Sequence, residues 1–235
     1  MRRFLVLGVL LTVLAACEAS PPPATTPVPQ ELRMQLRSGP SVPQNVNSFK
    51  RIVNRMEPVV ERECRRRASG LNCNFAIRVI TDPKQPPNAF QTLTKEGQPV
   101  LAFTATLIED VKNADELAFV LGHEAAHHIA GHLARQQQNA ALGAAVFGVL
   151  ASQTGGSVSD AQQLGATVGA RSYSKVFELE ADALGTELTY LSGYDPVVGA
   201  AYFTRIADPG NRFLGTHPPN NQRIETVLRT AARLQ

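Results

Sequence analysis

LGHEAAHHIAGH, residues 121–132, contains four of the five histidines of the chain. Within it, His123, Glu124 and His127 form an H-E-x-x-H pattern. On a helix, the two histidines of this pattern lie one turn apart on the same face, about 6 Å along the axis, where both can bind one metal ion. A catalytic zinc site takes three protein ligands and leaves one position for water. The stretch therefore predicts two ligands of a metal site whose third ligand lies elsewhere in the chain.

A second stretch, FELEAD at residues 177–182, supplies the candidate third ligand. Glu178 and Asp182 stand four positions apart on one face of a predicted helix, so Glu178 can bind the metal while Asp182 orients a ligand imidazole. Glu180 is the alternative ligand, but it lies about 200° around the helix from Glu178 and is expected to face away. Glu124 is expected to act as the general base that takes a proton from water.

The other three histidines are not expected to bind this metal. His128 and His132 lie about 100° and 140° around the helix from the two predicted ligands, and we interpret them as residues of the polar face or of the surroundings of the site. His217 precedes two prolines in a late loop, which hold it rigidly. It is predicted either to donate a hydrogen bond to the tetrahedral oxyanion or to cap the open metal position at rest, with a surface-loop histidine as the alternative.

The helix that carries the H-E-x-x-H pattern has a predicted start and a glycine in its interior. A capping box with Asn113 as N-cap and Glu116 reaching back is expected to open the helix, which should run to about Gln137. Gly122 inside it is predicted to permit the close approach of another backbone.

Residues 139–170 are rich in Gly, Ala and Ser and predict one or two helices with a flexible middle near Gly155 and Gly156. Gly143 and Gly148 are expected to permit tight packing of these helices. Contact with a membrane or control of substrate entry is the alternative role of this segment.

The remaining patterns predict an α+β domain that is mainly helical, with a small antiparallel sheet. Hydrophobic residues make up 43% and charged residues 18% of the chain, as in globular proteins. The net charge of +3, with scattered Lys and Arg, predicts no nucleic-acid partner. Strands are expected at residues 75–81, 88–93 and 99–103, and further helices at residues 48–67, 104–112, 171–192, 195–207 and 220–234, the first kinked or divided at Pro58.

Cysteines and the N-terminus point to an exported protein. Residues 1–16, with a basic start and an apolar run too short to span a bilayer, predict a signal peptide. Leu14 to Cys17 resembles a bacterial lipobox, which implies lipid on Cys17; ordinary cleavage with a free cysteine is the alternative. Residues 17–44 are rich in Pro, Ser and Thr and predict an extended tether to a domain at residues 45–235. In an oxidising compartment, Cys64 and Cys73 predict a disulfide in preference to a metal site.

Four motifs occur in order: NAF at 88–90, HEAAH at 123–127, FELEAD at 177–182 and THPPNNQRI at 216–224. Together they resemble the HtpX/BepA-like family of zinc metallopeptidases, which also includes the CAAX prenyl proteases. The resemblance covers residues 45–235. The membrane-spanning helices of HtpX and the tetratricopeptide-like tail of BepA are not expected here, so the chain is most similar to the small periplasmic lipoprotein members.

The resemblance implies a gluzincin endopeptidase that holds one Zn²⁺ per chain. Its ligands would be His123, His127 and Glu178, and Glu124 would be the catalytic acid and base. Further residues fall on site positions of the family: Asp182, His217 and Arg223.

These observations predict a zinc endopeptidase, anchored by lipid to the periplasmic side of the outer membrane, that degrades misfolded or stalled envelope proteins. Glu18 after the lipidated cysteine favours the outer membrane, because the inner-membrane retention signal known in enteric bacteria is aspartate. Outer-membrane assembly machinery is the expected protein partner. Two alternatives are a non-proteolytic chaperone or assembly factor for outer-membrane proteins, and a zinc-dependent cell-wall hydrolase.

Overall fold

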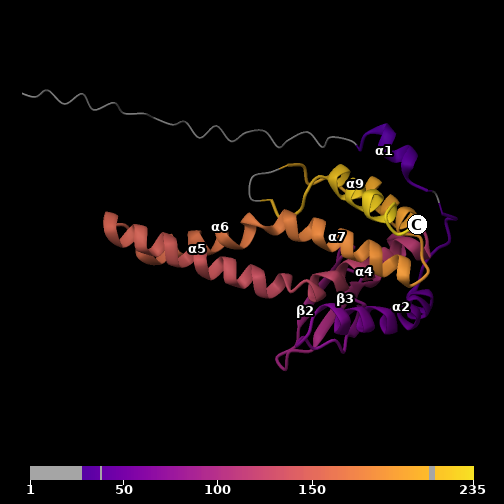
Figure 1. Cartoon of the computed structure of the whole chain (residues 1–235), viewed down its shortest axis with the longest axis horizontal. Coiled ribbons are helices and arrows are strands. Elements are labelled where there is room, and N and C mark those ends of the chain that lie inside the picture. Colours follow the sequence, from indigo (N-terminus) through magenta and orange to yellow (C-terminus); the bar gives the residue numbers. More distant parts are fainter. Residues whose placement is uncertain (1–27, 38, 212–214) are drawn as a thin grey trace, which may run out of the picture.

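A computed structural model of the chain describes residues 28–37, 39–211 and 215–235. The predicted signal peptide and Cys17 lie outside the described residues. The chain folds into a mainly helical body with a small sheet, from which a long helical hairpin projects (Figure 1). The helices are α1 (Gln30–Gln35), α2 (Val46–Arg67), α3 (Ala105–Asp110), α4 (Ala114–Ile129), α5 (His132–Thr154), α6 (Val158–Ser172), α7 (Ser174–Leu191), α8 (Pro196–Gly199), the 3₁₀ helix η1 (Ala200–Thr204) and α9 (Asn220–Ala231).

The small sheet is present but mixed, so the prediction of an antiparallel sheet holds for one strand pair and was wrong for the other. Strands β1 (Ala76–Ile80), β2 (Ala89–Leu93) and β3 (Pro99–Thr104) lie in the order β1-β3-β2. β3 pairs antiparallel with β2 but parallel with β1. Residues 81–88 carry the chain past the central position to the far edge, and the turn after β2 returns β3 between its neighbours. β3 has a mainly apolar sequence and is buried along its whole length, which agrees with its central position.

Helix α2 forms one side of the core and is tied to the sheet by a disulfide. Asn45 and Ser48 form a capping box at its start. The helix then runs through Pro58 as one element, so it is not divided there. The predicted disulfide between Cys64 and Cys73 is present and joins the end of α2 to the segment before β1.

Helix α4 begins as predicted but ends earlier. Asn113 caps it by accepting a hydrogen bond from the Glu116 backbone N–H at 2.9 Å. The Glu116 carboxylate does not complete the predicted capping box; it accepts from the Lys112 N–H at 2.8 Å and from Arg205. Gly131 has φ +67°, a left-handed conformation that stops the helix. The expected single helix to Gln137 is therefore two helices, and the chain turns at Gly131 before α5 begins.

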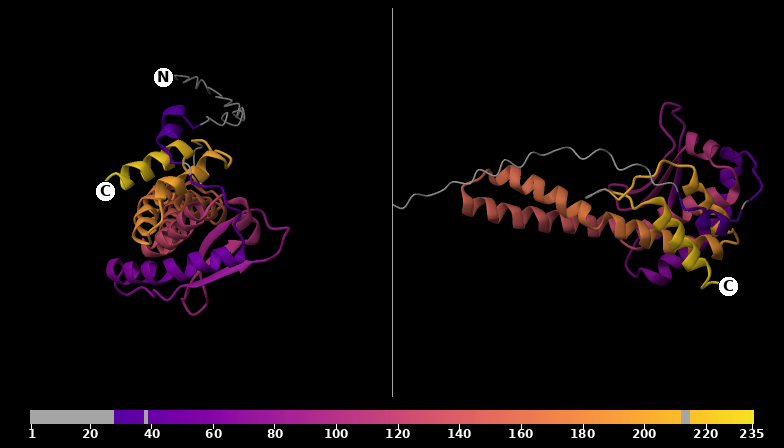
Figure 2. Two further views of the ribbon diagram at one scale, coloured as in Figure 1. Left: turned by 90° about the vertical axis from the view of Figure 1, so that its right-hand side faces the viewer. Right: turned by 90° about the horizontal axis from the view of Figure 1, so that it is seen from above.

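Helices α5 and α6 form the hairpin that extends away from the body (Figure 2). A Cβ atom on Gly143 would lie 2.0 Å from the carbonyl oxygen of Gly165, so only glycine permits this approach. This confirms the prediction of tight packing through Gly143. Among the described residues, no helix is long and apolar enough to cross a membrane.

Part of the predicted tether is folded. Val28 is buried, and Leu32 and Leu36 pack beside it against a small apolar cluster that includes Phe203 and Ile224. Leu32 lies within α1, and Val28 and Leu36 flank the helix on either side. Residues 28–36 thus differ from the extended segment that was expected, while residues 17–27 lie outside the part that the structure describes.

Candidate metal centre

The metal centre forms where α4 and α7 pack through two glycines. A Cβ atom on Gly122 would lie 2.9 Å from the carbonyl oxygen of Gly185, and one on Gly185 would lie 2.9 Å from the Cα atom of His123. This confirms the prediction that Gly122 permits close approach of another backbone. The contact brings the histidine face of α4 against the acidic face of α7.

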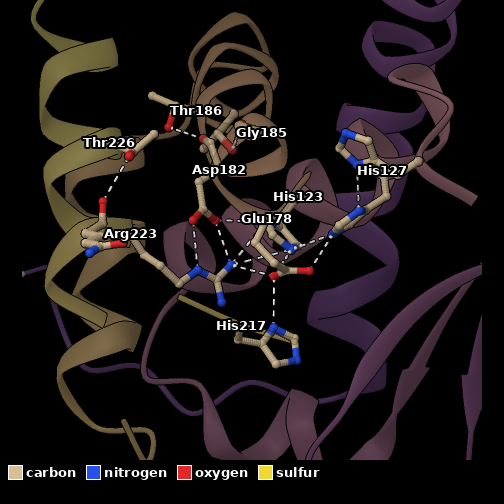
Figure 3. Close-up of polar contacts among 12 residues, drawn as sticks. His123, His127, Glu178, Asp182, Gly185, Thr186, His217, Arg223 and Thr226 are labelled. Atoms are coloured by element: carbon tan, nitrogen blue, oxygen red, sulfur yellow. Dashed lines mark hydrogen bonds and ion pairs between the residues drawn. The ribbon is translucent and has the colours of Figure 1, made fainter. Parts of the chain in front are cut away.

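His123, His127 and Glu178 converge at this contact, as predicted (Figure 3). Their ligand atoms all lie within 4.8 Å of one another. The Nε2 atoms of the two histidines are 3.0 Å apart, and the Glu178 carboxylate oxygens lie 3.5 Å from His123 Nε2 and 3.4 Å from His127 Nε2. Donor atoms that surround a zinc-sized ion as a tetrahedron at about 2.0–2.1 Å lie roughly 3.3 Å from one another. The three residues therefore fit a single metal ion with an open fourth position.

Asp182 and Arg223 hold the first histidine ligand. The Asp182 carboxylate lies 2.9 Å from His123 Nδ1, the nitrogen that faces away from the other ligands. Arg223, in the first turn of α9, donates two hydrogen bonds to Asp182 at 2.8 and 2.7 Å and stacks its guanidinium 4.1 Å over the Phe203 ring. Although burial disfavours a charged imidazole, hydrogen bonds to Asp182 and Glu178 raise the pKa of His123 to about 10 in the metal-free site, so a metal ion would bind at Nε2 by displacing a proton.

His217 reaches the centre from the loop before α9, as Figure 3 shows. Its Nδ1 atom lies 3.0 Å from the Glu178 carboxylate, and about half of the side chain is exposed. The structure thus brings the fifth histidine to the third candidate ligand from a position almost forty residues later in the chain.

Glu124 lines the same cavity as the three candidate ligands and is buried. Burial raises the pKa of its carboxyl group above the ordinary value. A buried carboxylate with increased proton affinity, adjacent to a metal site, is suited to accept a proton from water.

Three residues lie behind the second histidine ligand: His132, Glu180 and Arg135, of which Arg135 was not singled out from the sequence. His132 Nδ1 is 2.8 Å from His127 Nδ1, and His132 Nε2 is 3.0 Å from the Glu180 carboxylate. Arg135 donates two hydrogen bonds to the same carboxylate. Glu180 faces away from the metal ligands, as expected, but it is connected to one of them through His132.

His132 thus lies in the surroundings of the site, one of the two interpretations that the sequence left open. Angles around a continuous helix would place it about 140° from His127, but α4 ends at Ile129 and the turn at Gly131 redirects the chain. Gly131 was the available sequence signal. His128, still on α4, does lie apart from the centre: it bonds to the Asn72 carbonyl at 2.8 Å and packs edge-on against Phe75.

The centre opens into a cavity of about 590 Å³. One wall is the edge strand β2 with the residues just before it, another is the base of α5, and His217 lies at the side formed by the late loop. The cavity therefore joins the candidate ligands and Glu124 to a sheet edge along which a peptide can lie.

Comparisons with known proteins agree with this geometry. A model of peptidase family M48 matches residues 48–231. The mitochondrial metalloendopeptidase OMA1 of Saccharomyces cerevisiae is 30% identical over an alignment of 163 residues that covers 65% of this chain and 46% of that protein. The beta-barrel assembly-enhancing proteases of Yersinia pestis and Escherichia coli O157:H7 are 29% and 28% identical, over 56% and 52% of this chain. The matches span less than half the length of each relative, and no solved structure matches significantly.

Proposed function

The chain belongs to peptidase family M48, and we propose that this metallopeptidase uses zinc to cleave misfolded or stalled envelope proteins at the periplasmic face of the outer membrane. The observation that carries the proposal is the convergence of His123, His127 and Glu178 beside the buried Glu124, in a cavity bordered by an edge strand. The names of two relatives, beta-barrel assembly-enhancing proteases, support a substrate class in the envelope.

His123, His127 and Glu178 would hold the zinc ion. Two neutral imidazoles and one carboxylate are a ligand set found in catalytic zinc sites that keep an open position. Zinc in such a site acts as a Lewis acid that polarises a substrate carbonyl and makes water a stronger acid.

Glu124 would move the proton in this reaction. Its carboxylate accepts a proton from the attacking water and then delivers it to the leaving amine. Burial raises its pKa, so the proton is held more firmly between these two transfers than an exposed glutamate would hold it.

Strand β2 would position the substrate. It lies at the edge of the sheet, and residues 88–91 line the cavity. An edge strand has a row of free backbone N–H and C=O groups that can pair with an extended peptide. Folded proteins seldom expose an extended segment, whereas unfolded chains do, which supports misfolded proteins as substrates.

His217 would cover the open metal position at rest. Its contact with Glu178 and its place at the cavity bring it close to the candidate ligands, which supports this role. A lipid anchor at Cys17 would keep the domain at the membrane; the lipobox-like sequence before it supports this location.

The test is cleavage of an unfolded protein such as casein by the Glu124→Gln variant. We expect cleavage to fall by about 100-fold or more while one zinc ion per chain remains bound, because glutamine cannot accept the proton. Glu109→Gln, an exposed acidic position, is the matched control and should retain full activity. Undiminished cleavage by Glu124→Gln would contradict the mechanism.

Crosslinking in cells with Glu124→Gln should also trap the physiological substrates. If the trapped proteins are envelope proteins, the proposed substrate class is supported. Full rescue of a deletion strain by Glu124→Gln would instead favour a non-proteolytic assembly factor.

A further inference from the structure

Each candidate histidine ligand has a carboxylate and an arginine behind it, but the two arrangements differ. Behind His123, Asp182 makes direct contact and is itself held by Arg223. Behind His127, the carboxylate of Glu180 makes no direct contact with the ligand, because His132 lies between His127 and Glu180 and contacts both. Both carboxylates come from α7: Glu180 is two residues after Glu178, and Asp182 is four residues after it.

The direction of each hydrogen bond behind His127 follows from geometry. Nε2 of His127 faces the other ligands, so a metal ion there takes its lone pair and leaves the proton on Nδ1. His127 must then donate through Nδ1 to Nδ1 of His132. His132 in turn carries its proton on Nε2 and donates it to Glu180, since a neutral imidazole has one donor and one acceptor.

Packing fixes the ring of His132, which lies between His127 and Glu180, in this orientation. The His132 ring stacks on Phe177 with centroids 4.7 Å apart and an interplanar angle of 11°. Arg135 lies 4.3 Å over the Phe177 ring while it binds Glu180. His132 itself is buried. A side chain so constrained can impose its own orientation on a ligand that it contacts.

We propose that His132, with Glu180 and Arg135, is a positioning unit that fixes the orientation and tautomer of the metal ligand His127. The inference rests on the proposed binding of a metal by His123, His127 and Glu178. Residues of this kind act through the ligand and not on the substrate, and their loss typically lowers metal affinity by about 10- to 100-fold.

Two substitutions at His132 separate positioning from packing. In His132→Asn, the amide oxygen takes approximately the place of Nδ1, so an acceptor for His127 is kept. In His132→Gln, the amide lies near the place of Nε2, so the bond to Glu180 can be kept while the acceptor for His127 is lost. His128→Asn is the control, because His128 is a buried neighbour that points away from the centre.

The measurement is the zinc affinity of the full chain, obtained by titration against a chromophoric chelator, together with the melting temperature of the metal-free protein. We expect His132→Gln to bind zinc about 10- to 100-fold more weakly than the parent, and His132→Asn to lose much less. His128→Asn should lower the melting temperature and leave zinc affinity unchanged. Glu180→Gln should weaken zinc binding less than His132→Gln, because Glu180 acts at one remove.

Equal zinc affinities of the parent and both His132 variants would overturn the inference, and so would equal losses in Asn and Gln variants with matching losses of melting temperature. A parent chain that binds no zinc would instead contradict the proposed function itself. The two failures are therefore distinguishable.

Discussion

Two helix pairs of this molecule pack through facing glycines, and they serve different purposes. Helices α4 and α7 meet at Gly122 and Gly185, where the metal centre lies; α5 and α6 meet at Gly143 and Gly165 in the projecting hairpin (Figures 1 and 2). The approach is closer in the hairpin, where an added Cβ atom would meet a carbonyl oxygen at 2.0 Å, against 2.9 Å between α4 and α7.

The surroundings of the two contacts are opposite in character. The α4 and α7 pair is enclosed by the body and contains buried charges, among them Glu116, Glu178 and Asp182. In the hairpin, Asp160 is the only charged residue between Arg135 and Arg171. Close glycine contacts therefore occur in two different settings. Between α4 and α7 they lie beside a site that depends on the pairing of buried charges, and between α5 and α6 they lie in an arm that has few charges. We expect substitutions in the first pair to affect function and those in the second to affect local order.

The largest effect is expected where a buried charge of α4 loses its partner. Arg205 donates to both carboxylate oxygens of Glu116 at 2.6 and 2.7 Å, and Glu116 is almost completely buried. Arg205→Met should lower the free energy of unfolding by about 3 kcal/mol, because it leaves an uncompensated buried carboxylate. Urea denaturation at pH 7 measures this change.

Two controls define that result. Arg171→Met, at the exposed base of the hairpin, should change stability by less than about 0.5 kcal/mol. Adding Glu116→Gln to Arg205→Met should recover part of the loss, since an amide needs no ion pair. If Arg205→Met and Arg171→Met prove equally mild, the contrast between a charge-dependent body and an uncharged arm does not hold.

The next effect concerns activity. Gly185→Ala places a methyl group 2.9 Å from the backbone N and Cα atoms of His123, which is too close for a Cβ contact, so the backbone of one of the two helices must shift. The gain in helix propensity, about 1 kcal/mol, offsets part of an overpacking cost of about 1–3 kcal/mol, so the melting temperature should fall only modestly. Displacement of a ligand should nevertheless lower kcat/KM for a casein-derived peptide by about 10- to 100-fold. Unchanged kcat/KM would show that the glycine contact does not set the ligand geometry.

The convergence of the candidate metal ligands was predictable from the sequence because these residues follow local spacing rules. His123 and His127 share one helix face, as do Glu178 and Asp182, and a helix positions such pairs without reference to the rest of the fold. The cap at Asn113 and the glycine contacts at Gly122 and Gly143 are also local signals, and the structure confirms them.

What the sequence did not predict depends on non-local contacts. The parallel pairing of β1 with β3 depends on where residues 81–88 lead the chain. The burial of Val28 depends on a cluster formed by residues near the C-terminus. The direct contact of His132 with His127 depends on a single left-handed glycine, Gly131, which ends α4 and redirects the chain. Such turns are decided by the whole structure and are weakly encoded in periodicity.

A smaller, local effect is expected in the hairpin. Gly143→Ala must separate α5 from α6 by about 1 Å, at a local cost of roughly 1–2 kcal/mol after the gain in helix propensity. Amide hydrogen exchange in α5 and α6 should accelerate, while kcat/KM remains near that of the parent. Gly156→Ala is the matched control, because its nearest neighbour would lie 3.8 Å away. Loss of activity in Gly143→Ala would show that hairpin order is transmitted to the metal centre.

The smallest effect is expected on the outer face of α5. Leu142, Val146 and Val149 lie at helical spacing and are exposed by 66%, 57% and 57%. Their replacement by glutamine removes little buried apolar area, so each should change the free energy of unfolding by less than about 0.5 kcal/mol. Thermal melting and peptide cleavage measure this outcome, with Phe103→Gln in the buried sheet as the contrasting variant. A loss above about 1 kcal/mol would mean that this face is covered in the folded protein, and the hairpin would then resemble the body more than an exposed arm.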